Sequence, residues 1–266
     1  MIIYLGGCAW GCGYYIGIFK AIKELYPNEE IKIHGCSAGA LAGIYMILNI
    51  SIDNMKEHYL YFSTIARKKG IFLKMVEYHK QLFSDLIDND KEIYKKINNK
   101  LTIGITKFPF RYVKKTVWNS NEELKIDLHT SMCIPIYCSF LSNKNGYLSI
   151  DGGLSCDIHK LDSNIIKIGV SRDEYDISGN LSFNDIWFPP TEEKLNKLID
   201  KGYNDFINYT KNKNKPLPQK NKIIQKINYF IIVLILWLLH ILSIPFILIQ
   251  QRINNNKTKF NNLHRL

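Results

Sequence analysis

One serine stands in a setting that would make it a nucleophile. Gly35-Cys36-Ser37-Ala38-Gly39 fits the pattern G-x-S-x-G. Residues 31–34 before it predict a short strand, and the apolar run after it predicts a helix to about residue 48. A serine on a sharp turn between strand and helix, flanked by small residues, is typical of a nucleophile elbow. The sequence therefore predicts Ser37 as a nucleophile between the glycines Gly35 and Gly39; the alternative is an ordinary tight turn.

The general base is the less obvious group, because no histidine stands where a catalytic triad would need one. Asp151-Gly152-Gly153 directly follows the predicted strand 147–150 and places a carboxylate at a strand end with little around it. Such a carboxylate, if it lay within hydrogen-bond reach of Ser37, could take the serine proton. The alternative is a plain turn at Gly152 and Gly153. The histidine before the elbow, His34, is interpreted as a core residue.

A glycine-rich loop, Gly6-Gly7-Cys8-Ala9-Trp10-Gly11, follows the first predicted strand and opens a helix. Backbone N–H groups of such a loop can hold a phosphate or an oxyanion. It is not a Walker loop, because no Lys-Ser/Thr follows. Next to an elbow it predicts an oxyanion hole, with Gly6, Gly7, Cys8 and Gly11 as the candidate donors. A non-glycine such as Cys8 is tolerable there unless its φ must be positive.

The order of predicted elements indicates an α/β fold with parallel strands. Strand 2–5, a helix to residue 25, strand 31–34 and a second helix occupy the first fifty residues. Residues 53–100 predict helices whose apolar faces would form either a lid or an acyl groove. The later predicted elements are a strand pair at 101–106 and 111–118, a helix from residue 120, strands 147–150 and 165–170, and a helix at 191–209.

Composition argues against nucleic acid and metal as partners. The net charge is +11. Residues 211–266 contain ten Lys and Arg residues and no Asp or Glu, so residues 1–210 carry a net charge of only +1. A nucleic-acid-binding domain usually carries its basic excess on the folded surface. The six cysteines form no paired CxxC and no His pair has zinc spacing, so no metal and no cofactor is expected. With no signal peptide expected, these cysteines are predicted to be reduced thiols.

The C-terminal part predicts a membrane attachment. Residues 211–227 form a basic linker, and the segment 228–250 is almost wholly apolar and long enough to span a bilayer or to insert into one side of it. A basic tail, 251–266, follows. We expect a membrane protein, single-pass or tail-embedded, whose catalytic domain, residues 1–210, lies in the cytosol.

The motifs in this order resemble the patatin-like phospholipases, and within them the adipose triglyceride lipase and adiponutrin group. The supporting stretches run across residues 1–209: the glycine loop, Tyr14 to Gly17, Gly35 to Leu41, Ile134 to Cys138, Tyr147 to Gly153, Phe188 to Pro190 and Gly202 to Asp205. The resemblance implies a three-layer α/β/α fold with a mainly parallel central sheet. It also implies a Ser–Asp dyad of Ser37 and Asp151, an oxyanion hole in the first glycine loop, and hydrolysis of fatty acyl esters without metal. The loop departs from the family pattern in one of two ways: Cys8 stands at the third position if Gly6 is the first, and Ala9 replaces a glycine if Gly7 is the first.

The expected substrate is a lipid at a membrane or lipid-droplet surface. Neutral glycerides fit the subgroup and phospholipids fit the wider family; a protein co-activator is compatible with either. Two alternatives stay open. One is an acyltransferase on the same fold, which passes the acyl group to an alcohol. The other is a catalytically inactive, membrane-anchored lipid-binding pseudoenzyme.

Overall fold

The computed structural model describes residues 1–107, 111–134, 137–138, 142–144, 147–171 and 174–212. The apolar segment 228–250, the tail 251–266 and all but the first two residues of the predicted linker lie outside these residues. The catalytic domain expected to end at residue 210 ends with a helix that closes at Lys211. None of the described helices combines the length and the apolar character that crossing a bilayer would need.

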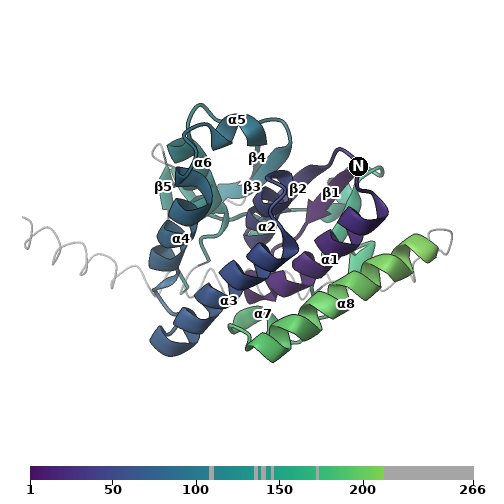
Figure 1. Ribbon diagram of the computed structural model, residues 1–266. Coiled ribbons are helices and arrows are strands. Elements are labelled where there is room, and N and C mark those ends of the chain that lie inside the picture. Colours follow the sequence, from purple (N-terminus) through teal and green to yellow (C-terminus); the bar gives the residue numbers. More distant parts are fainter. Residues whose placement is uncertain (108–110, 135–136, 139–141, 145–146, 172–173, 213–266) are drawn as a thin grey trace, which may run out of the picture. The chain divides into compact units, whose positions relative to one another are not determined.

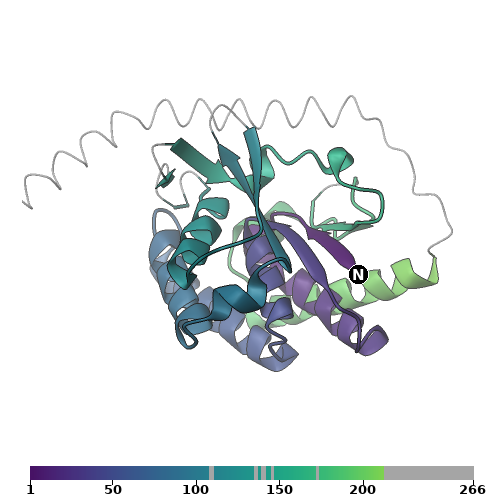
Figure 2. The same cartoon turned by 90° about the horizontal axis from the view of Figure 1, so that it is seen from above.

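A mixed sheet runs through the centre of the molecule (Figure 2). Its hydrogen-bonded order is β5-β6-β3-β2-β1-β7-β8, and β4 pairs with β3. The strands β3, β2, β1, β7 and β8 are parallel, as predicted, whereas β4, β6 and β5 join by antiparallel pairing. The strands are β1 (Ile2–Leu5), β2 (Lys32–Cys36), β3 (Leu101–Lys107), β4 (Arg111–Lys115), β5 (Ser142–Lys144), β6 (Tyr147–Asp151), β7 (Ile166–Gly169) and β8 (Ile177–Ser178).

The predicted helices are present. The helix predicted from residue 120 begins at Asn121, and the helix predicted at 191–209 spans Glu192–Lys211. Residues 53–100 form several separate helices, one of them a single π-helical turn, η2 (Ser84–Asp88). The α-helices are α1 (Cys12–Leu25), α2 (Ala38–Ile47), α3 (Ile52–Lys69), α4 (Met75–Phe83), α5 (Ile93–Ile97), α6 (Asn121–Ser131), α7 (Phe183–Trp187) and α8 (Glu192–Lys211). Short 3-10 turns are η1 (Ala9–Gly11), η3 (Gly152–Leu154) and η4 (Ile158–Lys160).

Side chains that alternate along the strands show which residues lie on each face of the sheet. Ile3 and Leu5 of β1 pack into the main core with Ile33 and the helices, as do Leu101 and Ile103 of β3. Successive side chains of a strand point to opposite faces. The residues between them therefore face the other way, and there Tyr4 and Cys36 form a second, smaller core with Ile158, Leu161 and Tyr175.

This second face corrects the three-layer expectation. Helices α1, α2 and α6 cover the main face, with α8 packed on α1 (Figure 1). The smaller core is closed, within the part of the chain that is described, by η4 and the irregular residues around it. The physical reason is the connection from β6 to β7, which supplies the residues of this smaller core and contains the 3-10 turns η3 and η4 but no α-helix. The α/β class and the largely parallel sheet are confirmed, and among the described residues a helical layer lies on one face only.

Two glycines allow helices α1 and α8 to touch backbone to backbone. A Cβ atom on Gly17 would lie 1.9 Å from the carbonyl oxygen of Ile199, and one on Gly202 would lie 2.0 Å from the carbonyl oxygen of Tyr14. Tyr14 also donates a hydrogen bond to Asp205 Oδ2 at 3.0 Å. The stretches 14–17 and 202–205, noted above as sequence motifs, therefore form a single helix-packing contact.

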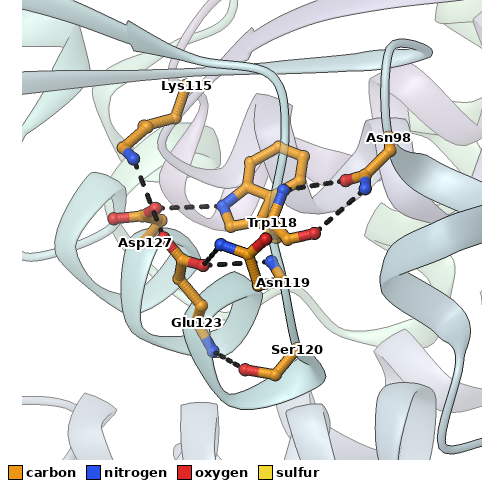
Figure 3. Close-up of polar contacts among 7 residues, drawn as sticks. All are labelled: Asn98, Lys115, Trp118, Asn119, Ser120, Glu123 and Asp127. Carbon is orange, nitrogen blue, oxygen red and sulfur yellow. Dashed lines mark hydrogen bonds and ion pairs between the residues drawn. The ribbon is translucent and has the colours of Figure 1, made fainter.

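Helix α6 is fixed at its start by a polar network around a buried tryptophan (Figure 3). Trp118 Nε1 donates to Asp127 Oδ2 at 2.9 Å, and the Asn98 side chain bonds both the N–H and the carbonyl of Trp118. Ser120 caps the helix by accepting from the Glu123 N–H. The predicted helix start at residue 120 is confirmed, and the network sets the position of the last residue of α6, Ser131.

Candidate active site

Ser37 occupies the turn between β2 and α2 with a backbone that few residues adopt. Its φ is 56° and its ψ is −137°. A non-glycine residue held at positive φ costs of the order of 1–3 kcal/mol and persists only where its surroundings enforce it. The flanking glycines do so by close contact. A Cβ atom on Gly35 would lie 2.4 Å from Ala40 Cα, and one on Gly39 would lie 2.4 Å from the carbonyl oxygen of Gly6. The strand–turn–helix setting predicted for the elbow is confirmed.

A second serine, which no sequence motif indicated, holds the elbow in place. Ser131 is fully buried; its hydroxyl accepts from the Ser37 N–H at 2.9 Å and donates to the Gly104 carbonyl at 2.6 Å. It lies 94 residues from Ser37 in the chain and belongs to no motif. Only its position at the end of α6, beside β3, brings it to the elbow.

Ser131→Ala is expected to lower any activity of Ser37 about tenfold through the rate of the chemical step, with little change in substrate binding. The substitution leaves the Ser37 N–H and the Gly104 carbonyl buried without their partner, which costs about 1–3 kcal/mol of stability. Ser63→Ala is the matched control, because it also removes a fully buried hydroxyl, one bonded to the Pro190 carbonyl at 2.5 Å. Equal effects of the two variants on kcat would contradict a positioning role for Ser131.

Strand pairing brings Asp151 to the same place as Ser37. Residues 101–104 of β3 pair with β2, and residues 105–107 pair with β6. Because β4 pairs with residues 103–107, β2 and β6 must share the opposite edge of β3. Cys36 is opposite Gly104, and Asp151 is opposite Ile105. The two strands therefore end facing each other, and Ser37 and Asp151 stand at that junction.

The carboxylate of Asp151 is buried, and only one of its two oxygens accepts a hydrogen bond among the described residues. Its Oδ1 accepts from the Gly153 N–H at 2.8 Å, whereas Oδ2 has no hydrogen-bond partner within the described part of the chain. Burial raises the pKa of Asp151 to about 6, and the Ser37 hydroxyl and the Gly153 N–H oppose this rise. The Ser37 hydroxyl is therefore near enough to stabilise the carboxylate without completing a hydrogen bond of ordinary geometry. Catalytic hydrogen bonds are often long before substrate binds.

Each glycine after Asp151 has a separate structural role. A Cβ atom on Gly152 would lie 2.0 Å from the Gly104 carbonyl oxygen, so this glycine allows the turn to press against β3. Gly153 supplies the N–H that orients Asp151, and a Cβ there would approach Asp151 Oδ1 to 3.1 Å. The Asp-Gly-Gly motif thus fixes the direction of one carboxylate.

The glycine loop lies against the serine, but its N–H groups differ in availability. Gly6 donates to the Ile168 carbonyl at 3.0 Å and Gly11 donates to the Cys8 carbonyl at 2.7 Å. No acceptor within the described residues is recorded for the N–H groups of Gly7 and Cys8. A Cβ atom on Gly7 would lie 3.2 Å from Ser37 Cβ. Of the four candidate donors, Gly7 and Cys8 are therefore the two that could serve an oxyanion.

The cysteine at the third loop position does not disturb the backbone. Cys8 has φ −134°, an ordinary value for any residue, and the positive φ of the loop falls on Ala9, at 42°. The Cys8 sulfur lies 3.2 Å from that of Cys12, inside the protein. Cys8 therefore meets the condition set for a non-glycine residue in this loop, whereas Ala9, the other possible departure from the glycine pattern, stands at positive φ.

An apolar pocket opens beside the elbow, with about 720 Å³ of empty space, part of it open to solvent. Ala38, Leu41 and Ala42 of α2 form one wall. The helices of residues 53–100 form another, which favours a groove over a lid as their role. The remaining lining residues are Ala9, Trp10, Cys12, Ile16, Phe19, Tyr45, Met55, Tyr59, Phe62, Met75, Tyr78, His79, Leu82 and Met132.

The pocket carries no charge near neutral pH. His79 is its one histidine, and burial, helped by His129, lowers the pKa of His79 to about 3. Its neutral ring lies with Nδ1 3.4 Å from that of His129. A pocket of this size, lined by apolar and neutral groups, suits an alkyl chain.

The remaining interpretations concern His34 and the six cysteines. His34 is buried on the smaller core, where Nε2 lies 2.8 Å from the Tyr112 hydroxyl, and burial lowers the pKa of His34 to about 4. It is the core residue that was expected. The six cysteines are free thiols. Within the described residues, no group of three or more His, Cys, Asp or Glu side chains is placed to hold a metal ion.

Comparison with known proteins finds relatives of this chain by sequence. No protein-family model matches the chain. Omega-hydroxyceramide transacylase of Mus musculus is 27% identical over 240 residues, which cover 76% of this chain and 39% of that protein. Patatin-like phospholipase domain-containing protein 2 of Homo sapiens is 22% identical over 256 residues, which cover 81% of this chain and 50% of that protein. The chain is therefore similar in sequence to a patatin-like phospholipase over 81% of its length.

The chain matches half or less of the length of these two relatives. Among solved structures, VipD from Legionella pneumophila matches with a TM-score of 0.48 and 11% identity, covering 79% of this chain and 66% of that one. The similarity to patatin-like proteins rests on the sequence relatives and on the motifs, and the mixed α/β sheet described above is compatible with it.

Proposed function

We propose that this protein hydrolyses fatty acyl esters through a dyad of Ser37 and Asp151. The observation that carries the proposal is the Oδ2 atom of Asp151, a buried carboxylate oxygen with no partner beside the hydroxyl of a serine at positive φ. A buried polar atom without a partner is costly, and such atoms are retained where they have a function. The proton of the Ser37 hydroxyl is the partner that this oxygen lacks.

The proposed reaction has two steps. Asp151 takes the Ser37 proton as Oγ attacks the ester carbonyl, and the N–H groups of Gly7 and Cys8 hold the oxyanion, next to the positive end of α2. The leaving alcohol takes the proton from Asp151 and leaves an acyl-enzyme. Asp151 then removes a proton from water, which attacks the acyl carbonyl and releases the fatty acid and free Ser37.

The pocket supports a long acyl chain as the substrate group. Its wall begins at Ala38, the residue after the nucleophile, so a chain lying in it would present its ester to Ser37. The substrate proposed is therefore a lipid ester, reached at a membrane or lipid-droplet surface. Neither a cofactor nor a metal is required by the steps above.

Acyl transfer to an alcohol is the second candidate, and one observation favours it. One relative is named a transacylase. The same acyl-enzyme would form, and the outcome would depend on whether water or a hydroxyl group attacks it. Product analysis with a radiolabelled acyl ester and an excess of a monoacylglycerol separates the two: free fatty acid indicates hydrolysis and diacylglycerol indicates transfer.

A fluorophosphonate probe tests the nucleophile directly. We expect the full chain to be labelled at Ser37, since the probe needs only an activated serine and an oxyanion site. Ser37→Ala should not be labelled, and Ser131→Ala should be labelled more slowly. A wild-type chain that is folded yet does not react would overturn the proposal and favour a lipid-binding pseudoenzyme.

A further inference from the structure

Exposed aromatic and apolar side chains gather on two segments next to the pocket. Phe72 and Leu73, between α3 and α4, are 57% and 54% exposed; Phe183 and Phe188, on and after α7, are 67% and 43% exposed. Ring contacts join the segments in a chain from Phe72 to Tyr137, Trp187, Phe183 and Phe188, with centroids 5.5 to 6.3 Å apart. We call these residues the aromatic patch. Side chains this large are seldom exposed together without a function.

The aromatic patch is attached to the wall of the pocket. Ile71, directly before Phe72, is buried with Trp10 and Phe62, both of which line the pocket. The Tyr137 carbonyl accepts from the Met75 N–H at 3.2 Å, and the Tyr137 hydroxyl donates to the Trp187 carbonyl at 2.8 Å, so Tyr137 links the loop of residues 70–74 to α7. Helix α7 in turn lies against η1, the turn that ends the glycine loop. In Figure 1 the end of α3, α7 and the start of α8 lie at the same end of the molecule.

Positive charge surrounds the loop and is not neutralised by the protein. Arg67, Lys68, Lys69 and Lys74 are exposed, and no Asp or Glu occurs between residues 67 and 76. Within the described residues none of these four has a recorded ion pair, although Lys74 donates to the Lys69 carbonyl. The acidic groups near α7 and the start of α8 are engaged, Asp185 by Lys194 and Glu192 by Lys56. Glu77, in the first turn of α4, is exposed and has no ion pair within the part of the chain that the structure describes.

The loop presents its apolar tip outward at some backbone cost. Leu73 has φ 61°, the left-handed region that leucine rarely adopts. Its side chain is more than half exposed and does not repay that cost by burial in the core. Backbone positions strained in this way are concentrated at functional sites.

We propose that the aromatic patch is the surface by which the catalytic domain binds an anionic lipid bilayer. Phe72, Leu73 and Phe183 would enter the boundary between headgroups and acyl chains, and the basic residues 67–69 and 74 would lie among anionic headgroups. A protein partner with an acidic, apolar face is less well matched, because the exposed apolar tip consists of few residues and positive charges surround it. The inference concerns binding and does not depend on the reactivity of Ser37.

An environment-sensitive label on the loop tests this surface in the full chain. Leu73→Cys is labelled with nitrobenzoxadiazole in a Ser37→Ala background, which prevents turnover; the six native cysteines are buried. With vesicles of 70% phosphatidylcholine and 30% phosphatidylserine, the label should shift to the blue and brighten at least twofold. A label at Val117→Cys, a residue 49% exposed near the start of α6, is the matched control and should not change. Phe72→Cys repeats the test if Leu73→Cys folds poorly.

The charged residues are tested in the same labelled protein. Arg67→Gln/Lys68→Gln/Lys69→Gln should raise the lipid concentration for half-maximal shift at least tenfold, because three cations that would attract the anionic headgroups are removed. Lys32→Gln/Lys91→Gln/Lys100→Gln is the control and should leave it unchanged. A label that stays in water while the protein sediments with vesicles would overturn the proposal and place binding elsewhere in the chain. A shift without vesicles that grows with protein concentration would overturn it in favour of a second copy.

Discussion

Asp151→Asn is expected to lower ester hydrolysis by about three orders of magnitude or more while the protein stays folded. The amide keeps the size of the carboxylate and can still accept from the Gly153 N–H, but it cannot take a proton from Ser37. Removal of a general base typically costs 10²–10⁴-fold in rate. The measurement is the rate of acyl-enzyme formation with a soluble long-chain ester, so that membrane binding does not enter.

The same substitution should stabilise the fold at high pH, which separates lost chemistry from misfolding. Burial raises the pKa of Asp151 to about 6, from an ordinary value of 3.8. The folded state therefore holds this proton more tightly than the unfolded state, and stability falls as pH rises from about 4 to about 6. Asparagine does not ionise, so Asp151→Asn should be more stable than the wild type by about 3 kcal/mol at pH 8 and no more stable below pH 4.

Asp157→Asn is the matched control, because Asp157 also accepts the N–H two residues later but at an exposed turn. It should change neither the rate nor the pH dependence of stability. Undiminished hydrolysis by Asp151→Asn would remove Asp151 from the mechanism. Full activity at pH 4.5 would also contradict the proposal, since the base would then be largely protonated.

Gly17→Ala is expected to destabilise the protein by about 3 kcal/mol or more. In an ordinary helix, alanine is more favourable than glycine by about 1 kcal/mol, so any loss must come from steric contact. The new Cβ atom would lie 1.9 Å from the Ile199 carbonyl oxygen, a backbone atom of α8 that cannot turn away. Helices α1 and α8 would have to separate, and the cost is that of overpacking. Urea unfolding measures the change.

Gly13→Ala provides the control on the same two helices. Its Cβ atom would meet the end of the Leu195 side chain at 2.6 Å, which can adopt another rotamer. We expect a loss of about 1 kcal/mol or less for this variant. If Gly13→Ala were as damaging as Gly17→Ala, the effect would come from helix α1 itself and not from its contact with the Ile199 carbonyl.

The sequence alone determined the order of elements and the two central residues. The elbow at Ser37 and the motif at Asp151 were predicted because each depends on local requirements: a serine on a sharp turn between glycines, and an aspartate ahead of glycines at a strand end. The parallel arrangement of the first strands followed from strand–helix alternation in the same way. The predicted membrane segment 228–250 lies outside the described residues and stays a prediction.

Tertiary structure alone decided how Ser37 and Asp151 are brought together and what surrounds them. That β2 and β6 end on one edge of β3 depends on antiparallel pairing, which no local pattern specifies. Ser131 holds the Ser37 backbone from 94 residues away. Gly6 and Gly11 were equal to Gly7 and Cys8 as candidate oxyanion donors until their N–H groups were found bonded to carbonyls. The pocket is likewise formed by helices distant in sequence. The physical reason is common to all of these: a hydrogen-bond partner or a cavity wall is defined by where chain segments meet, and residue type and spacing do not encode that meeting.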